Sequence, residues 1–234
     1  MPNDTLDRRQ LFGAAAVLAA AAPVLAKADT EPTTAGTAFM PKSAVLPFDP
    51  KSVGWLSEKL LTSHHDNNYV GAVKRLGAIS GQFASLDPAT APGFVINGLK
   101  REELIAWNSM VLHELYFSGF GTPNKPGAAL AAAIERDFGS DARWRAEFAG
   151  MGKALGGGSG WVLLTWTPHD RRLTNQWASD HTQTMAGATP ILALDMYEHA
   201  YAMDFGAKAG AYVDGFMAAI NWSSADAGYA KAVA

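Results

Sequence analysis

The stretch LDMYEHAYAMD near the C-terminus brings a carboxylate and an imidazole together in an otherwise apolar segment. Asp195 and His199 are four residues apart, and Glu198 comes directly before the histidine. A buried carboxylate is costly unless it is paired or bound to a metal. Because imidazole and carboxylate together suit iron, manganese or zinc, this stretch predicts a metal site. The site would be built without thiolates, since the chain has no cysteine.

Two further histidines lie in apolar segments with helical spacing, His64 in SHHDNNY and His113 in WNSMVLHELYF. A single histidine on an apolar face is more often a hydrogen-bonded core residue than a ligand, because its ring can bond locally. Taken together with Asp195 and His199, however, both fit a divalent or trivalent metal that satisfies all four groups at once. His169, in a predicted turn, is interpreted as a solvated loop residue.

Other classes of site and partner find no support in the sequence. HELYF begins like the zinc-protease motif HExxH, but Phe117 stands where the second histidine belongs. No P-loop or GxSxG motif occurs, and GGGSG at residues 156–160 lacks a following lysine and predicts a tight turn. The formal net charge of −3 and the absence of a long basic run predict no nucleic-acid partner.

The periodicity of apolar residues predicts two domains in this 234-residue chain. Residues 46–122 predict an N-terminal helical domain, with one helix over 53–76 that Ser57 begins and another over 101–117. Residues 123–234 predict a C-terminal α/β domain that carries the Asp195 and His199 pair.

In the second domain, two helices broken at Gly139 and Ser140 precede a β-hairpin with its turn at residues 168–170. Helical patterning returns from Met196 to about residue 229. This order predicts an α+β fold, in which an N-terminal helical hairpin domain is followed by a mixed domain with a small antiparallel sheet flanked by helices.

The first 28 residues have the pattern of a twin-arginine-type signal peptide. Arg8 and Arg9 precede an alanine-rich apolar run, and small residues follow at Ala26 and Ala28. The run is too short to span a bilayer comfortably, so we expect no stable membrane insertion after cleavage and a periplasmic or secreted protein. An uncleaved N-terminal helix is the alternative. Residues 29–45, rich in Thr, Ala and Pro, predict an extended arm.

Six blocks of the sequence resemble, in order and spacing, those of the iron/manganese superoxide dismutases. They lie within residues 46–222 and read LSEKLLTSHHD, WNSMVLHELYF, FGSDARWRAEF, GSGWVLL, LALDMYEHAY and AAINW. The resemblance implies a divergent, exported member of that family that converts superoxide to oxygen and hydrogen peroxide at one iron or manganese ion per chain. The ligands that it implies are His64, His113, Asp195 and His199. It also implies a homodimer in which Glu198 reaches across the interface.

In the family, a glutamine usually contacts the solvent molecule on the metal and so tunes its potential. The two positions from which it comes correspond here to Ser109 and, by ungapped alignment along the hairpin strand, to His181. His181 is therefore the candidate catalytic contact, with Asp180 or a surface histidine at a strand end as alternatives. The resemblance implies that Trp161 and Tyr116 line the pocket, although ordinary core packing explains either ring equally well. Tyr69 is a candidate to fill part of the altered entrance.

Several family positions near the site entrance are altered. The residues concerned are Asn68, Ala72, Ala202 and Ala209. Candidates for a local basic focus that attracts an anion are Lys74, Arg75 and Lys208, although a solvated face is the better interpretation of the first two. The alternative function is therefore a metal-binding homologue with reduced or lost turnover and a structural or metal-holding role. The sequence does not distinguish iron from manganese.

Overall fold

The computed structural model describes residues 35–234. The predicted signal peptide and residues 29–34 of the predicted arm lie outside the described residues. Ala35–Ala234 form one compact unit. The predicted boundary after residue 122 falls in the loop between residues 118 and 128, where it stays a prediction.

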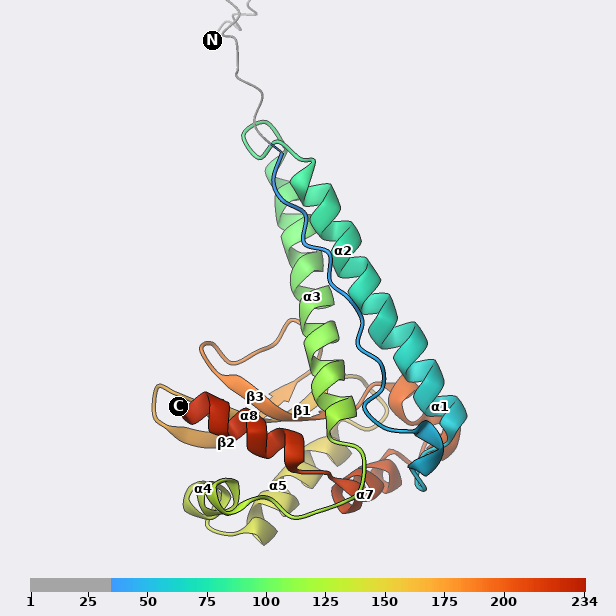
Figure 1. Cartoon of the computed structure of the whole chain (residues 1–234), viewed down its shortest axis with the longest axis vertical. Helices are drawn as coiled ribbons and strands as arrows, with labels where there is room; N and C mark the ends of the chain where they lie inside the picture. Colours follow the sequence, from blue (N-terminus) through green and yellow to red (C-terminus); the bar gives the residue numbers. More distant parts are fainter. Residues whose placement is uncertain (1–34) are drawn as a thin grey trace, which may run out of the picture. The chain divides into compact units, whose positions relative to one another are not determined.

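Two long helical segments run side by side in the first half of the described chain (Figure 1). After the short 3-10 helix η1 (Pro50–Ser52), the first comprises α1 (Glu58–Ser63), the π-helical η2 (His64–Tyr69) and α2 (Val70–Ala84), and the second is α3 (Gly93–Ser118). The predicted helical hairpin is therefore confirmed.

The boundaries of both helical segments differ from those predicted. Ser57 begins α1 as expected, since its Oγ accepts a hydrogen bond from the amide of Leu60 at 3.1 Å. The helical path then continues to Ala84 instead of ending at residue 76, and α3 begins at Gly93 instead of residue 101. Glycine and β-branched residues lower the intrinsic helix propensity of GFVINGLK, but packing of α3 against α2 outweighs that preference.

The described part of the arm, residues 35–45, has no regular secondary structure and follows α2 (Figure 1). Its amides bond to the helix at successive points. Gly36 donates to the carbonyl of Ala84 at 3.0 Å, and Phe39 donates to Oγ of Ser80 at 2.7 Å. The arm therefore runs antiparallel to α2.

The sheet has three antiparallel strands in the order β2-β1-β3. β1 (Trp161–Thr167) and β2 (Arg172–Ala178) form the predicted hairpin, and β3 (Thr189–Asp195) pairs with the other edge of β1. The sequence pattern does not reveal β3, because its last five residues are all buried and show no polar alternation. The α+β fold is confirmed.

Helices cover the sheet and close the chain. α4 (Ala128–Phe138) and α5 (Asp141–Ala154) are separated as predicted, with Gly139 in the left-handed conformation at φ 84°. The predicted helical region after Met196 consists of four short helices: η3 (Glu198–Ala200), α6 (Ala202–Phe205), α7 (Ala209–Ala219) and α8 (Ser223–Val233). None of the described helices is both long and apolar enough to cross a membrane.

Buried side chains link the helical hairpin to the sheet in a shared core. Leu60, Tyr116, Trp144 and Phe216 come from α1, α3, α5 and α7 and belong to the same cluster. β3 packs against α3. The C-terminal end of this strand, Asp195, therefore reaches the helical hairpin at the level of its histidines.

Candidate metal centre

The two helical histidines are placed by different local structures. His64 is the first residue of the π-helical turn η2, a kind of irregularity that occurs frequently at functional sites. His113 lies in α3, and both side chains are buried. The two rings meet edge to face, with their centroids 5.0 Å apart.

The other two candidate ligands lie at the end of β3 and in the short helix η3 just after it. Asp195 is its last residue and is fully buried, opposite Trp161 in the sheet register. Its Oδ1 accepts a hydrogen bond from the amide of Tyr197 at 2.8 Å, which turns Oδ2 toward the histidines. His199 lies in η3, and its side chain is 26% exposed.

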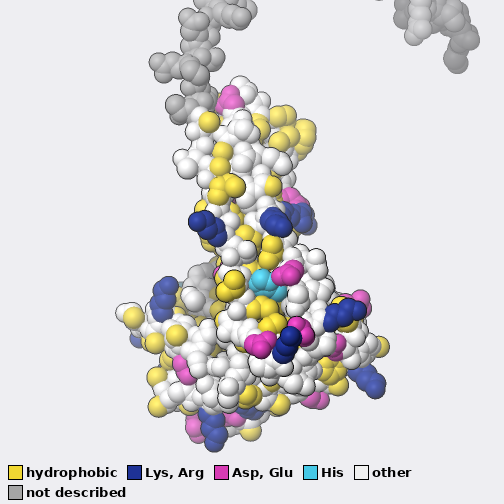
Figure 2. All heavy atoms as spheres, turned by 45° about the vertical axis from the view of Figure 1, so that its right-hand side comes forward, with side chains coloured by type: hydrophobic (Ala, Val, Ile, Leu, Met, Phe, Trp, Pro, Cys, Tyr) yellow, Lys and Arg dark blue, Asp and Glu magenta, His cyan; other side chains and the backbone are white. Residues whose placement is uncertain are grey.

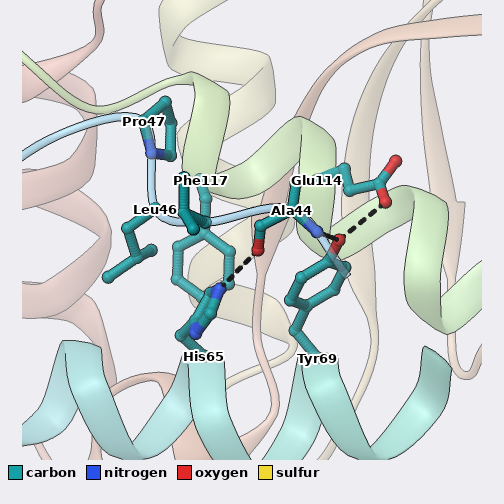
Figure 3. A pocket seen from close by; sticks show the side chains of 8 residues that line it. Ala44, Leu46, Pro47, His65, Tyr69, Glu114 and Phe117 are labelled. Atoms are coloured by element: carbon teal, nitrogen blue, oxygen red, sulfur yellow. Dashed lines mark hydrogen bonds between the residues drawn. The ribbon is translucent and has the colours of Figure 1, made fainter. Parts of the chain in front are cut away.

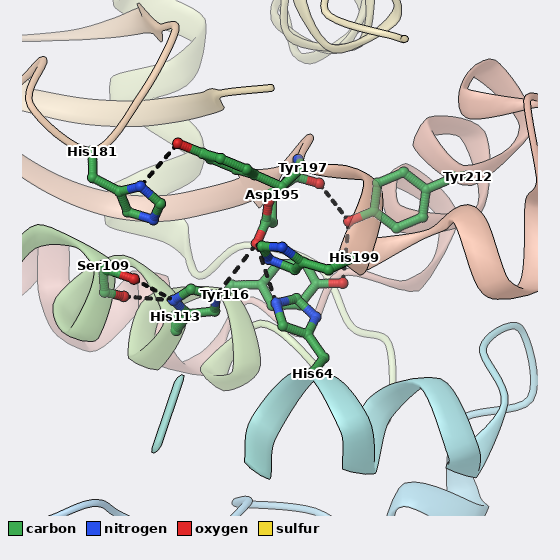
Figure 4. A network of polar contacts seen from close by, with 9 residues as sticks. All are labelled: His64, Ser109, His113, Tyr116, His181, Asp195, Tyr197, His199 and Tyr212. Atoms are coloured by element: carbon green, nitrogen blue, oxygen red, sulfur yellow. Dashed lines mark hydrogen bonds and ion pairs between the residues drawn. The ribbon is translucent and has the colours of Figure 1, made fainter. Parts of the chain in front are cut away.

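The three candidate histidines converge on Oδ2 of the fourth candidate, Asp195 (Figure 4). Nε2 of His64 and Nε2 of His199 each lie 3.2 Å from it, and Nε2 of His113 lies 3.6 Å away. One potential ligand atom from each of the four residues lies within 4.8 Å of the other three. The structure thus brings together the four residues that the sequence predicts as ligands.

The hydrogen bonding of the two buried histidines leaves nitrogen atoms facing this point without partners. Nδ1 of His113 donates to the carbonyl of Ser109 at 2.6 Å, so its Nε2 is the unprotonated nitrogen and lacks a partner among the described residues. Neither ring nitrogen of His64 makes a hydrogen bond with them. Buried nitrogens without partners are costly, and a cation would satisfy them.

Protonation of these groups also fits a cation. Burial lowers the pKa of His113 to about 3 and lowers that of His64 as well, so both imidazoles are neutral near pH 7. Burial alone would raise the pKa of Asp195, but the neighbouring His199 and His64 outweigh burial and lower it. A carboxylate and neutral imidazoles with free nitrogens are the donor set that iron, manganese or zinc takes, so these residues fit a bound metal.

Aromatic side chains enclose the centre. The Trp161 ring meets the His113 ring edge-on, with the ring centroids 5.3 Å apart. The ring centroids of Tyr116 and His64 are 5.1 Å apart. The hydroxyl of Tyr212 donates to the backbone carbonyl of Asp195 at 2.7 Å and lies 3.1 Å from the hydroxyl of Tyr116. All three aromatic residues are fully buried, so they keep bulk water from the side of the centre that holds His64, His113 and Asp195.

His181 lies in the loop that follows β2, beyond the strand end at Ala178. Its Nδ1 is 2.9 Å from the hydroxyl of Tyr197, while its Nε2 is buried without a hydrogen-bond partner among the described residues. Figure 4 shows Nε2 on the side of the ring that faces the candidate ligands. Asp180, the alternative, accepts from the amide of Thr182 at 2.7 Å and so stabilises the turn.

Tyr69 lines a surface pocket beside the centre (Figure 3). Its hydroxyl accepts from the amide of Ala44 at 2.7 Å and donates to Oε1 of Glu114 at 2.9 Å. Phe117 lines the same pocket, and its ring is 5.0 Å from that of His64. Tyr69 therefore links the arm to α3, and its ring meets that of Phe117 with the centroids 6.4 Å apart.

The residues at altered family positions take several environments. Ala72 and Ala209 are buried, Asn68 is half-buried and Ala202 is exposed. Glu198 is also exposed, and its carboxylate makes no hydrogen bond or ion pair with a described residue.

The predicted basic candidates differ in their ion pairing. Arg75 pairs with Glu102, while Lys74 and Lys208 are exposed. On the face drawn in Figure 2, a histidine lies among apolar and acidic side chains, with basic side chains on both flanks of the hairpin. Attraction of an anion by these basic residues stays a prediction.

Sequence reasoning missed the roles of two tyrosines. Tyr197 contacts His181 across 16 residues, and Tyr212 contacts Asp195 across 17. Tyr197 stands inside the conspicuous LDMYEHAY stretch, yet no spacing rule indicates its partner. Tyr212 has no sequence signal beyond an apolar position in a helix.

The fold and the centre together define an α+β protein with a site for one metal ion, made of three histidines and one aspartate. Residues 126–228 match the C-terminal domain of the iron/manganese superoxide dismutases. The chain is 64% identical over 185 residues to "Superoxide dismutase [Fe]" of Cupriavidus metallidurans. The aligned residues cover 79% of this chain and 94% of that protein.

More distant relatives carry either metal in their names. The identity is 33% over 181 residues to "Superoxide dismutase [Mn] 1" of Halobacterium salinarum, covering 76% of this chain and 88% of that protein. The identity to "Superoxide dismutase [Fe]" of Synechococcus elongatus is 33% over 201 residues, covering 81% of this chain and 96% of that protein. The chain belongs to the iron/manganese superoxide dismutase family.

Proposed function

We propose that the chain is a superoxide dismutase that uses one iron or manganese ion held by His64, His113, Asp195 and His199. The observation that carries this function is the convergence of three histidine nitrogens on Oδ2 of Asp195 at 3.2 to 3.6 Å. In the reaction, two superoxide anions and two protons give one oxygen and one hydrogen peroxide. The ion, when bound, supplies a one-electron couple that one superoxide reduces and the next reoxidises.

The chain's own residues set the conditions for this reaction. The carbonyl of Ser109 fixes the proton of His113 on Nδ1 and leaves Nε2 as a ligand atom. Tyr212 holds the backbone of Asp195. Burial by Trp161 and its neighbours excludes bulk water, and His181 presents a shielded ring nitrogen that can hydrogen bond to an oxygen anion in the site.

The direct test is superoxide consumption per bound metal, measured on iron-loaded and manganese-loaded protein. We expect at least one form to be active, and His113→Gln to lose both metal and activity. His169→Gln is the matched control, because His169 is an exposed turn residue. Stoichiometric metal with no consumption by either form would instead support a metal-holding role.

Export through the twin-arginine route to the periplasm or beyond is a second part of the proposal. It is supported by Arg8 and Arg9 ahead of the apolar run. We expect Arg8→Lys with Arg9→Lys to trap the protein in the cytoplasm, as measured by cell fractionation. Replacing the second arginine pair, Arg171 and Arg172, by lysines should leave export unchanged, and export of both variants would contradict the proposal.

We further propose a homodimer in which Glu198 reaches across the interface. Support comes from its exposed carboxylate, which has no partner among the described residues, next to the partly exposed His199. Glu198→Ala should weaken dimerisation in sedimentation at decreasing concentration, because it leaves a partner group unpaired. The control is Glu135→Ala, because Glu135 is also exposed but lies on a different helix, α4. Equal dissociation of both variants would contradict the role of Glu198.

A further inference from the structure

Tyr197 bridges the end of β3 to the loop that carries His181. Its amide donates to Oδ1 of Asp195 at 2.8 Å, and its hydroxyl lies 2.9 Å from Nδ1 of His181. The two rings are 4.8 Å apart. One residue thus contacts both the buried carboxylate and the histidine that we place at the site.

The geometry leaves His181 one protected nitrogen to present to the centre. Nε2 is buried, lacks a hydrogen-bond partner among the described residues and faces the ligands (Figure 4). A neutral imidazole carries one N–H, and the bond made by the other nitrogen decides which nitrogen that is. If Nδ1 accepts from the hydroxyl of Tyr197, the proton must be on Nε2.

We propose that Tyr197 is a positioning residue that donates its hydroxyl proton to Nδ1 of His181 and so keeps the His181 N–H on Nε2, directed at the metal centre. This inference rests on the proposed function, since it assigns how a second residue prepares His181 to donate a hydrogen bond within that site. Nothing in the linear pattern around Tyr197 indicates this role.

The chemistry of the two groups supports this direction of the hydrogen bond. A neutral phenol carries one hydroxyl proton, and a neutral imidazole carries one N–H. When the phenol donates to Nδ1, the imidazole N–H is on Nε2, which is buried and turned toward the ligands. A hydrogen-bond donor at that point suits an oxygen anion in the site.

The loop holds His181 in place for this contact. The side-chain amide of Asn108 on α3 donates to the carbonyl of His181, and Asp180 accepts from the amide of Thr182. The ring also meets Trp161 edge-on, with the centroids 5.7 Å apart. Because the backbone is held from both sides, removing the Tyr197 hydroxyl changes the hydrogen bonding of the ring more than the position of the loop.

The direct test locates the proton. In neutron diffraction from crystals of the iron-loaded, deuterium-exchanged protein, we expect deuterium on Nε2 of His181 and none on Nδ1. Deuterium on Nδ1 would overturn the proposal, whatever the activity of the enzyme.

The solution test uses Tyr197→Phe, which removes only the hydroxyl. Metal content should stay unchanged, while the electron paramagnetic resonance spectrum of bound iron(III) and its midpoint potential should both shift. Tyr229→Phe is the control, because it removes a hydroxyl from a buried tyrosine that packs on Trp166 far along the chain, in α8. A spectrum and potential of Tyr197→Phe identical to those of the parent would refute the role.

A double-mutant cycle separates action through His181 from any other effect of the hydroxyl. In a His181→Leu background, Tyr197→Phe should cause no further spectral or potential shift, and a shift of undiminished size would overturn the proposal. Superoxide consumption is measured in parallel. If the parent binds iron but consumes no superoxide, the proposed function fails, while the proton position and the cycle still decide the role of Tyr197.

Discussion

The helical hairpin and the end of β3 each contribute two of the four candidate ligands, but they hold them by different means. His113 is oriented within its own helix, since Nδ1 donates to the carbonyl four residues earlier. Asp195 has one local contact, from the amide of Tyr197 to Oδ1, but it also depends on distant residues, because its neighbours in space include Trp161 on β1 and Tyr212 on α7. The orientation of His113 is therefore local, whereas that of Asp195 combines local and tertiary contacts.

The largest expected effect, on metal affinity, comes from removing a candidate ligand from the helical hairpin or from the end of β3. We expect Asp195→Ala and His113→Ala to lower metal affinity by more than the roughly 10–100-fold that loss of an outer hydrogen-bond partner causes. The metal-dependent rise in Tm should disappear with it, since bound metal contributes to the free energy of unfolding. Metal analysis and thermal unfolding with and without metal measure both effects.

The same two variants also test the ligand assignment itself. Each variant loses one of the four candidate ligands, so metal analysis should find both below full occupancy. Full metal occupancy in both variants would show that the ligand assignment is wrong.

A smaller effect is expected from the tertiary support of Asp195. Tyr212→Phe leaves the buried carbonyl of Asp195 without its donor, which costs about 1–3 kcal/mol in the free energy of unfolding. Metal affinity should fall too, by no more than the roughly 10–100-fold that loss of an outer hydrogen-bond partner causes, because Tyr212 holds the backbone of this ligand and not its carboxylate. Denaturant unfolding and metal competition measure the two quantities.

The control for this variant is Tyr229→Phe, which keeps the metal affinity of the parent. If Tyr212→Phe also keeps the parent's affinity, the backbone of Asp195 is held well enough by the sheet alone. The contrast between local and tertiary positioning would then be weaker than we infer.

The smallest effect is expected at the start of the helical hairpin. Ser57→Ala removes the cap of α1 and the hydrogen bond from Oγ of Ser57 to Asp204 at 2.7 Å, and should cost about 0.5–2 kcal/mol. Metal content should stay at the parent level, because His64 is held further along the helix.

Ser140→Ala is the matched variant, since Ser140 caps α5 by accepting from the amide of Arg143. Denaturant unfolding should show a cost for Ser57→Ala that equals or exceeds that for Ser140→Ala. A loss of metal with Ser57→Ala alone would show that ligand positioning in the hairpin depends on the helix start, contrary to the comparison.

Much of the fold follows from local sequence signals. Ser57 predicts the start of α1, Gly139 predicts the break between α4 and α5, and alternation predicts the hairpin of β1 and β2. These signals depend on only a few neighbouring residues, so they can be recognised without the tertiary structure. β3 escapes prediction because a strand buried on both faces has no polar face to give it a period.

For the site, the sequence alone determined which four side chains are candidate ligands, because a carboxylate and several histidines in apolar segments need a common partner. The tertiary structure decided where they meet, through the packing of β3 against α3, and which atoms face one another at 3.2 to 3.6 Å. It also decided that Tyr197 lies against His181 and Tyr212 against Asp195. Such contacts join side chains on separate elements, so they depend on how those elements pack and leave no periodic trace in the chain.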